Sequence, residues 1–276
     1  MAVITMTREM GTLGKDVAQG IADQLGVTVV HHELVEHHLS ERLGVQESAV
    51  HRYLEGSASL LERWKIDGKK LSHFTAEEIL ELAQKGNVLI RGWGGAMVLR
   101  AIAHVFHLRV CAPMAFRERV MMERLGLGER SLARREIERN DAAHARTVQG
   151  SFGVDWQDPL LYDMVLNTER VATAVGAKLV CTLVDSPAFR ATEESRQMLS
   201  DRLLEARIRI VLSDHYGAGT GVTGIEATVE KGKVILTGTA IHTRLGADAA
   251  EIVRSVPGVK EVENRVVIVR SPHASL

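Results

Sequence analysis

Glycine and lysine follow an apolar stretch at the start of the chain, at a spacing that suits phosphate binding. Residues 3–7 are Val-Ile-Thr-Met-Thr, and a glycine-containing turn separates them from a helical pattern. Glycine lets successive backbone N–H groups face one side, and the positive end of the following helix adds to their attraction for anions. The predicted phosphate contacts are Gly11, Thr12, Leu13, Gly14, Lys15 and Asp16.

The loop departs from the full P-loop pattern at two positions. Glu9 stands where a first glycine is expected, and Asp16 stands where a Ser or Thr would bind magnesium. From the loop alone, two interpretations are about equally good: a phosphate cradle with Lys15 as its mobile charge, or a strand-to-helix turn whose glycines serve packing.

Histidine and cysteine offer two further kinds of chemistry, and neither pattern is complete. The cluster at 31–38 is His-His-Glu-Leu-Val-Glu-His-His, and Glu36 occupies the position where a zinc-binding HExxH helix needs histidine. We therefore expect a solvated helix there and assign no metal ligand. Cys111 and Cys181 lack CxxC partners and lie in apolar surroundings, so we expect buried, reduced thiols without a function.

Short apolar runs separated by helix-length segments would position the loop. Such runs occur at 3–7, 27–30, 88–90, 108–112 and 164–166. A helical pattern over 15–25 ends at Gly26, and this alternation predicts one doubly wound domain with a parallel sheet. A charged segment at 47–74 is expected to be a helical insertion, and an arginine-dense stretch follows at 117–146.

Composition limits the classes of partner. The chain has 276 residues with 45% hydrophobic content, which suits about two domains. Lys and Arg number 34 against 35 Asp and Glu, and aromatic residues make up 4%, so we expect no nucleic-acid partner. The apolar stretches are strand-sized and no secretory signal begins the sequence, so we expect no transmembrane segment and a cytoplasmic location.

A second domain is expected after a polar connection at 187–198. A helix at 199–212 and a flexible loop at 217–224 precede strands at 225–230 and 233–237, joined at Lys231-Gly232 as in a tight hairpin. A helix at 247–253 and a strand at 262–269 complete an α-β-β-α-β order.

The ordered motifs resemble two known families. Residues 4–11, Arg91-Gly92 within 89–94, 110–113, the arginine-rich helices, 155–159 and 162–168 together resemble the cytidylate-kinase-like family of P-loop nucleoside monophosphate kinases. This resemblance covers 1–186 and implies a P-loop parallel five-stranded sheet with helices on both faces and a helical lid. Residues 199–271 resemble a BON domain, a small α+β module without catalytic residues.

The first resemblance implies phosphoryl transfer from ATP, with Mg²⁺, to a nucleoside monophosphate such as CMP or dCMP. Lys15 and the loop amides would hold the β- and γ-phosphates, while Arg91 and Gly92 would bind the acceptor phosphate. Asp16 would act on the magnesium through water. The implied catalytic residues, besides Lys15, are the lid arginines Arg135, Arg139 and Arg146 and the orienting Asp141.

The lid also supports a second interpretation. After Asp141 the sequence is Ala-Ala-His-Ala-Arg, whereas relatives carry more basic residues there. Loss of one charge-assisted contact to a transferring phosphoryl group costs a few kcal/mol. The alternative is therefore a nucleotide-binding regulator with weak or no catalysis, which acts through a BON domain that binds a small molecule, a lipid or a protein.

Overall fold

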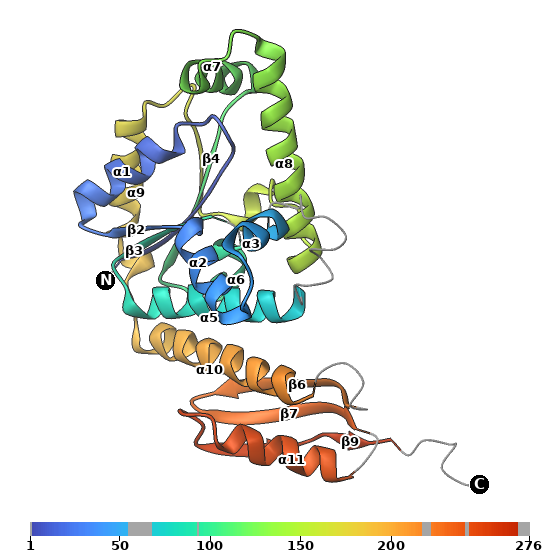
Figure 1. Ribbon diagram of the computed structural model, residues 1–276. Helices are drawn as coiled ribbons and strands as arrows, with labels where there is room; N and C mark the ends of the chain where they lie inside the picture. The colour runs from blue at the N-terminus through green and yellow to red at the C-terminus, as the bar shows by residue number, and fades with distance from the viewer. Residues whose placement is uncertain (1, 55–67, 93, 217–221, 241–242, 270–276) are drawn as a thin grey trace.

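The described residues form two β-sheets, one after the other along the chain (Figure 1). The computed structural model describes residues 2–54, 68–92, 94–216, 222–240 and 243–269. The first sheet has five parallel strands in the order β2 (Thr28–His31), β3 (Val88–Arg91), β1 (Val3–Arg8), β4 (Val105–Cys111) and β5 (Met164–Asn167). All five predicted strands are confirmed.

The fourth strand is longer than the sequence pattern predicts. β4 begins at Val105, which pairs with Val3, rather than at residue 108. Two histidines in this region interrupt the apolar pattern. One of them, His107, is buried and shares a 2.7 Å hydrogen bond with Thr5 on β1, so its polar ring is accommodated inside the sheet.

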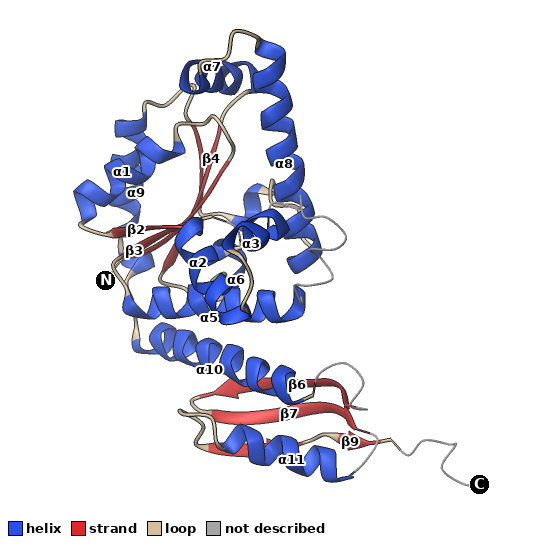
Figure 2. Cartoon of the chain, in the orientation of Figure 1, coloured by secondary structure: helices blue, strands red, loops and turns tan. Residues whose placement is uncertain are grey.

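Helices cover both faces of this sheet (Figure 2). On one face, α1 (Gly14–Leu25) and α9 (Thr173–Val184) pack on the β1 side chains Ile4 and Met6. On the other face lies α5 (Gly68–Lys85), whose apolar residues share a cluster with Val3. Burial on both faces explains why these strands are continuously apolar rather than alternating.

Besides α5, three described helices between β2 and β4 belong to the second face and its edge. These are α2 (His32–Leu43), α3 (Glu47–Leu54) and the short α6 (Gly95–Val98). The insertion predicted at 47–74 is helical at both ends, in α3 and in the first part of α5, and its residues 55–67 lie outside the described residues.

The predicted helical lid consists of α7 (Met114–Leu125) and α8 (Arg130–Phe152). In Figure 1, α7 lies beyond the carboxyl end of β4, and α8 runs from there back along the side of the domain. Met121, Ala133 and Ile137 form a small buried cluster between the two helices. This cluster holds them together as a pair. The η1 turn (Pro159–Leu161) then leads into β5.

The second sheet forms the α+β domain. β6 (Val222–Glu230) pairs antiparallel with β7 (Lys233–Ala240), and the turn between them has φ values of 51° at Lys231 and 82° at Gly232, which favours the predicted tight hairpin. After α11 (Thr243–Arg254), the strand predicted at 262–269 is divided into two pieces that both pair parallel with β7: β8 (Glu261–Asn264) and β9 (Val267–Ile268). Of the loop predicted at 217–224, residues 217–221 lie outside the described residues and 222–224 belong to β6.

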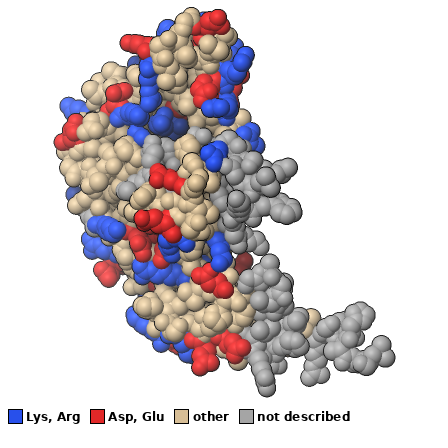
Figure 3. All heavy atoms as spheres, in the orientation of Figure 1, with Lys and Arg blue, Asp and Glu red and all other residues tan. Residues whose placement is uncertain are grey.

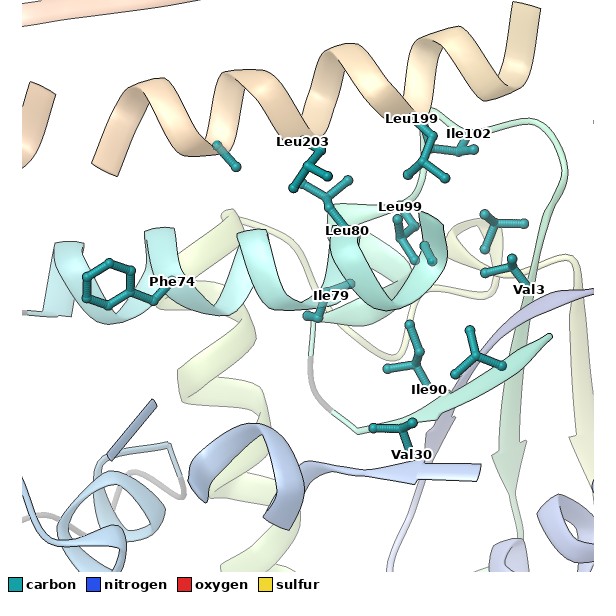
Figure 4. Packing of buried hydrophobic residues seen from close by; sticks show 14 of the residues in the cluster. Val3, Val30, Phe74, Ile79, Leu80, Ile90, Leu99, Ile102, Leu199 and Leu203 are labelled. Carbon is teal, nitrogen blue, oxygen red and sulfur yellow. The ribbon is translucent and has the colours of Figure 1, made fainter. Parts of the chain in front are cut away.

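The helix α10 (Glu193–His215) joins the two halves, and it begins inside the stretch expected to be a polar connection. The η2 turn (Pro187–Phe189) precedes it, and Thr192 caps it together with Ser195. One face of α10, with Leu199 and Leu203, packs against α5 (Figure 4). Another face, with Leu204 and Ile208, belongs to the core of the second domain.

None of the helices in the described residues combines the length and apolar character needed to cross a bilayer.

Candidate functional site

The loop after β1 adopts a conformation that depends on glycine. The chain is left-handed at Gly11 (φ 80°) and at Leu13 (φ 55°) before α1 begins at Gly14. A Cβ atom at Gly11 would lie 2.7 Å from the backbone oxygen of Arg117, so no other residue fits without movement of the main chain. Left-handed residues alternating along a turn give the concave arrangement of N–H groups that binds anions.

Two threonine hydroxyls fix this loop from inside. Thr12 Oγ1 donates a 2.7 Å hydrogen bond to the backbone oxygen of Glu9, and Thr168 Oγ1 donates one of the same length to the backbone oxygen of Thr12. Both threonines are buried. The segment after β5 therefore holds the loop that follows β1, which gives the motif at 162–168 a structural role.

Glu9, which the sequence pattern marked only as a departure, anchors the loop to β4. Its carboxylate is buried and accepts a 2.6 Å hydrogen bond from Arg109 Nη2. Its second oxygen lies 3.4 Å from Arg117 Nη1 and accepts a weak bond from the Ala112 N–H. Removal of either guanidinium group would leave this buried carboxylate poorly compensated, and that loss is expected to be destabilising.

Arg117 on α7 connects the loop to the lid. Its Nε donates a 2.7 Å hydrogen bond to the backbone oxygen of Met10, and its Nη2 donates a 2.7 Å bond to Asp141 on α8. The sequence interpretation assigned Asp141 to the lid arginines, whereas its carboxylate contacts Arg117. The alternating charges at 117–146 gave no indication that this particular arginine is buried.

A cavity of about 570 Å³ lies at the carboxyl ends of β2 and β3, beside the start of α1. Two residues expected to bind phosphate both line this cavity: Lys15, expected at the β- and γ-phosphates, and Arg91, expected at the acceptor phosphate. Arg91 is buried, and Gly92 after it has φ 149° and donates its N–H to the Met6 backbone oxygen. The other lining residues are Ala18, Gln19, Val29, His31 and His37.

His31 and His37 were not predicted to contribute to this site. They come from the cluster interpreted as a solvated helix, and both are exposed, yet both line the cavity. His37 also lies 3.2 Å from Glu47 on α3. The sequence did contain one indication of this role for His31. It directly follows the strand predicted at 27–30, and ligands bind at the carboxyl ends of parallel strands.

The predicted lid arginines lie on the outer side of α8. Arg135, Arg139 and Arg146 are exposed and are not among the described residues that line the cavity. Arg139 is 72% exposed and pairs with Glu136 on its own helix at 2.7 Å. Figure 3 shows a group of Lys and Arg side chains below α7 on the visible face, with Asp and Glu side chains beside it.

His144 packs inward rather than toward the cavity. Its ring stacks on the buried Trp156 at a centroid separation of 4.2 Å, and the Arg109 guanidinium lies 5.4 Å from the same indole ring. Tyr162 donates its hydroxyl proton to the Trp156 backbone oxygen at 2.7 Å, and burial raises the pKa of that hydroxyl. This aromatic contact fixes the middle of α8 against the segment that leads into β5.

Glu118 attaches the first turn of α8 to α7. Its buried carboxylate accepts hydrogen bonds from Arg130 and Arg134, and the Arg130 bond is the main cause that lowers the pKa of Glu118. The carboxylate is therefore ionised at neutral pH and holds both arginines at the base of the lid.

Both cysteines are free thiols, as predicted. Cys181 is buried on α9, whereas Cys111 at the end of β4 is only half-buried. Burial, followed by the charge of Glu9, raises the pKa of the Cys111 thiol, so the thiol remains protonated at neutral pH.

A parallel five-stranded sheet with a glycine loop after β1 and a helical pair over it defines a P-loop kinase-like protein. The chain belongs to the cytidylate kinase-like family, which its residues 3–170 match. Residues 200–270 match the BON domain.

Individual relatives are distant. A protein named cytidylate kinase from Pyrobaculum aerophilum is 25% identical over 187 residues, which are 66% of this chain and 94% of that protein. The crystal structure of an uncharacterized protein from Eubacterium ventriosum ATCC 27560 is 17% identical, covers 67% of this chain and 98% of its own, and has a TM-score of 0.52. The latter similarity concerns the fold alone.

Proposed function

We propose that the protein transfers a phosphoryl group from ATP to a nucleoside monophosphate, with CMP or dCMP as the acceptor. The observation that carries this proposal is the shared cavity of Lys15 and Arg91 beside the phosphate loop. Transfer requires positive charge on both substrates and a fixed alignment between them, and two cations in one cavity meet the first requirement.

The loop suits the triphosphate of ATP. Gly11 has no room for a side chain, the loop leads into the positive N-terminal end of α1, and Lys15 adds a mobile charge there. Asp16, the third residue of α1, is exposed and would hold Mg²⁺ through water. When bound, magnesium would neutralise charge on the transferring phosphoryl group.

The acceptor phosphate would bind Arg91, whose guanidinium suits two parallel contacts to phosphate oxygens. Because Arg91 is buried at the end of β3, its position is fixed by the sheet rather than by solvent. Gly92 would let the backbone approach the acceptor. Inward movement of α7 and α8 would exclude water and carry Arg135, Arg139 and Arg146 toward the phosphates.

The second candidate is a nucleotide-binding regulator with little catalysis. His144 stacks on Trp156 instead of supplying a cation to the cavity, which favours weak catalysis. Because α10 packs on both domains, nucleotide binding would be coupled to the BON domain through this helix. The BON domain would bind a small molecule, a lipid or a protein. The whole protein would be located in the cytoplasm.

A coupled assay of ADP release with ATP, Mg²⁺ and each nucleoside monophosphate separates the two candidates. The kinase proposal predicts turnover that is fastest with CMP or dCMP and is unchanged in Lys85→Ala, a control at an exposed lysine at the end of α5. If no monophosphate is phosphorylated while ATP still raises the melting temperature, the kinase proposal is wrong and the regulator stands.

A further inference from the structure

The outer face of α9 is unusually apolar for a helix on the surface. Lys178 is the one charged residue among the twelve of Thr173–Val184. Val175, Leu179 and Leu183 follow each other at four-residue spacing and are 53%, 46% and 40% exposed. A surface helix normally carries charged and polar residues opposite its buried face.

The buried face of α9 is already occupied. Ala177, Val180 and Cys181 belong to the cluster beneath α1, and Gly20 of α1 approaches the Ala177 methyl group closely. The exposed stripe is therefore a second apolar face, separate from the one that holds α9 on the sheet.

Two opposite charges border this stripe. Lys178 and Asp185, the residue that caps α9, are both exposed, and within the described ranges neither forms an ion pair. They are seven residues apart, which is about two helical turns, so they lie on the same flank of α9.

We propose that α9 pairs with α9 of a second copy of this chain, in an antiparallel arrangement with a two-fold axis near Cys181 and Thr182. In a two-fold interface, both subunits contribute the same surface patch. The charged flank of one α9 therefore lies beside the charged flank of the other. This axis places Leu179 opposite Leu183 of the partner subunit and Lys178 opposite Asp185 of the partner subunit.

The charges favour a second copy over a different partner. One axis satisfies both the apolar contacts and the two symmetry-related ion pairs, so the stripe is complementary to itself. An anionic membrane would instead require an excess of basic residues around the stripe, and on α9 with its cap a single lysine is balanced by an aspartate. Because α9 has only twelve residues, the dimer is a weak one that forms as the protein concentration rises.

Sedimentation equilibrium over a range of concentrations tests the proposal with the full chain. The wild-type mass should rise from 30.3 kDa toward twice that value. Leu179→Glu should raise the dimer dissociation constant by about tenfold or more. The matched control is Leu132→Glu, which introduces the same charge at a leucine of α8 that is 43% exposed and should leave the constant unchanged.

Charge reversal tests the register of the two helices. Lys178→Glu and Asp185→Lys should each weaken the dimer because each places like charges opposite one another, and the double variant should restore wild-type association. All of these positions are exposed, and circular dichroism verifies that each variant is folded. A wild-type protein that remains monomeric at every concentration, or a double variant without recovery, would overturn the proposal. Neither result bears on nucleotide binding.

Discussion

The two ends of the kinase-like domain are stabilised by different physical means. At the phosphate loop, Arg109, Glu9, Arg117 and Asp141 form a mostly buried chain of ion pairs. At the junction with the BON domain, α10 instead packs leucines against α5, and its Arg207 pairs with Glu77 and Glu81 beside them.

This difference follows from what each end must do. Hydrogen bonds between charged groups fix distances and angles, which a site that aligns two phosphates requires. Apolar burial is non-directional and approximately proportional to area, so it joins two domains without fixing any single atom. The comparison therefore predicts that substitutions at the loop end affect both stability and phosphate binding, whereas substitutions at the junction affect stability alone.

The largest expected effect is that of Arg117→Ala. This change leaves Glu9 and Asp141 without a cation that contacts both, and we expect it to lower the free energy of unfolding by about 4 kcal/mol. Urea denaturation measures the change. Arg117→Lys keeps the charge and should cost less, and equal losses for the two variants would contradict the role given to this ion-pair chain.

Leu203→Ala at the junction should cost somewhat less. Leu203 is 2% exposed between α10 and α5, and truncation of a buried leucine costs about 3 kcal/mol. Leu132→Ala, at the 43% exposed leucine of α8, is the control and should have little effect. Calorimetric titration with ATP should show unchanged affinity in the folded Leu203→Ala variant, and a strong loss would mean that the junction also shapes the phosphate site.

A pair of glycine substitutions isolates the fit of the phosphate loop. Gly11 and Gly44 have similar φ values, 80° and 63°, but a Cβ meets the Arg117 backbone at Gly11 and nothing within 4 Å at Gly44. Gly11→Ala should therefore destabilise the protein by about 2 kcal/mol more than Gly44→Ala. Thermal melting with and without ATP measures this difference, and equal losses in the two variants would show that the close contact is unimportant.

The smallest expected effect is a dependence of stability on pH from two buried histidines. Burial is the main cause that lowers the pKa of both His104 and His107. The unfolded state then binds more protons, so the stability contributed by the neutral rings is complete above about pH 6.5 and is lost as the pH falls toward the lowered pKa values. His104→Gln should flatten the acidic side of the stability curve, and an unchanged slope would contradict this origin.

Most of the fold could be predicted because its pattern is local. Apolar runs and glycine turns located all five strands of the first sheet and the hairpin of the second. The double role of α10 could not be predicted, because neighbouring residues such as Leu203 and Leu204 contact different domains. A sequence pattern shows that both are apolar, but it does not show which surface each one meets.

The site was predictable only in part for the same reason. The pattern indicated Lys15 and Arg91, which occupy the expected ends of elements. It missed Glu9 and Arg117, whose partners lie about 100 residues away along the chain, and such pairs leave no local periodicity. The lid arginines were expected from the family resemblance. Their distance from the cavity could not be predicted, because it depends on where α8 lies relative to the sheet.

Phosphorus NMR of the wild-type protein with ATP, Mg²⁺ and CMP would follow the proposed phosphoryl transfer through its two products. The resonances of ADP and CDP are expected to grow together in equal amounts. Lys15→Ala should slow both by about a hundredfold or more, while Lys85→Ala does not. ADP that forms without CDP, or no transfer to any monophosphate by a folded protein that binds ATP, would contradict the proposed transfer.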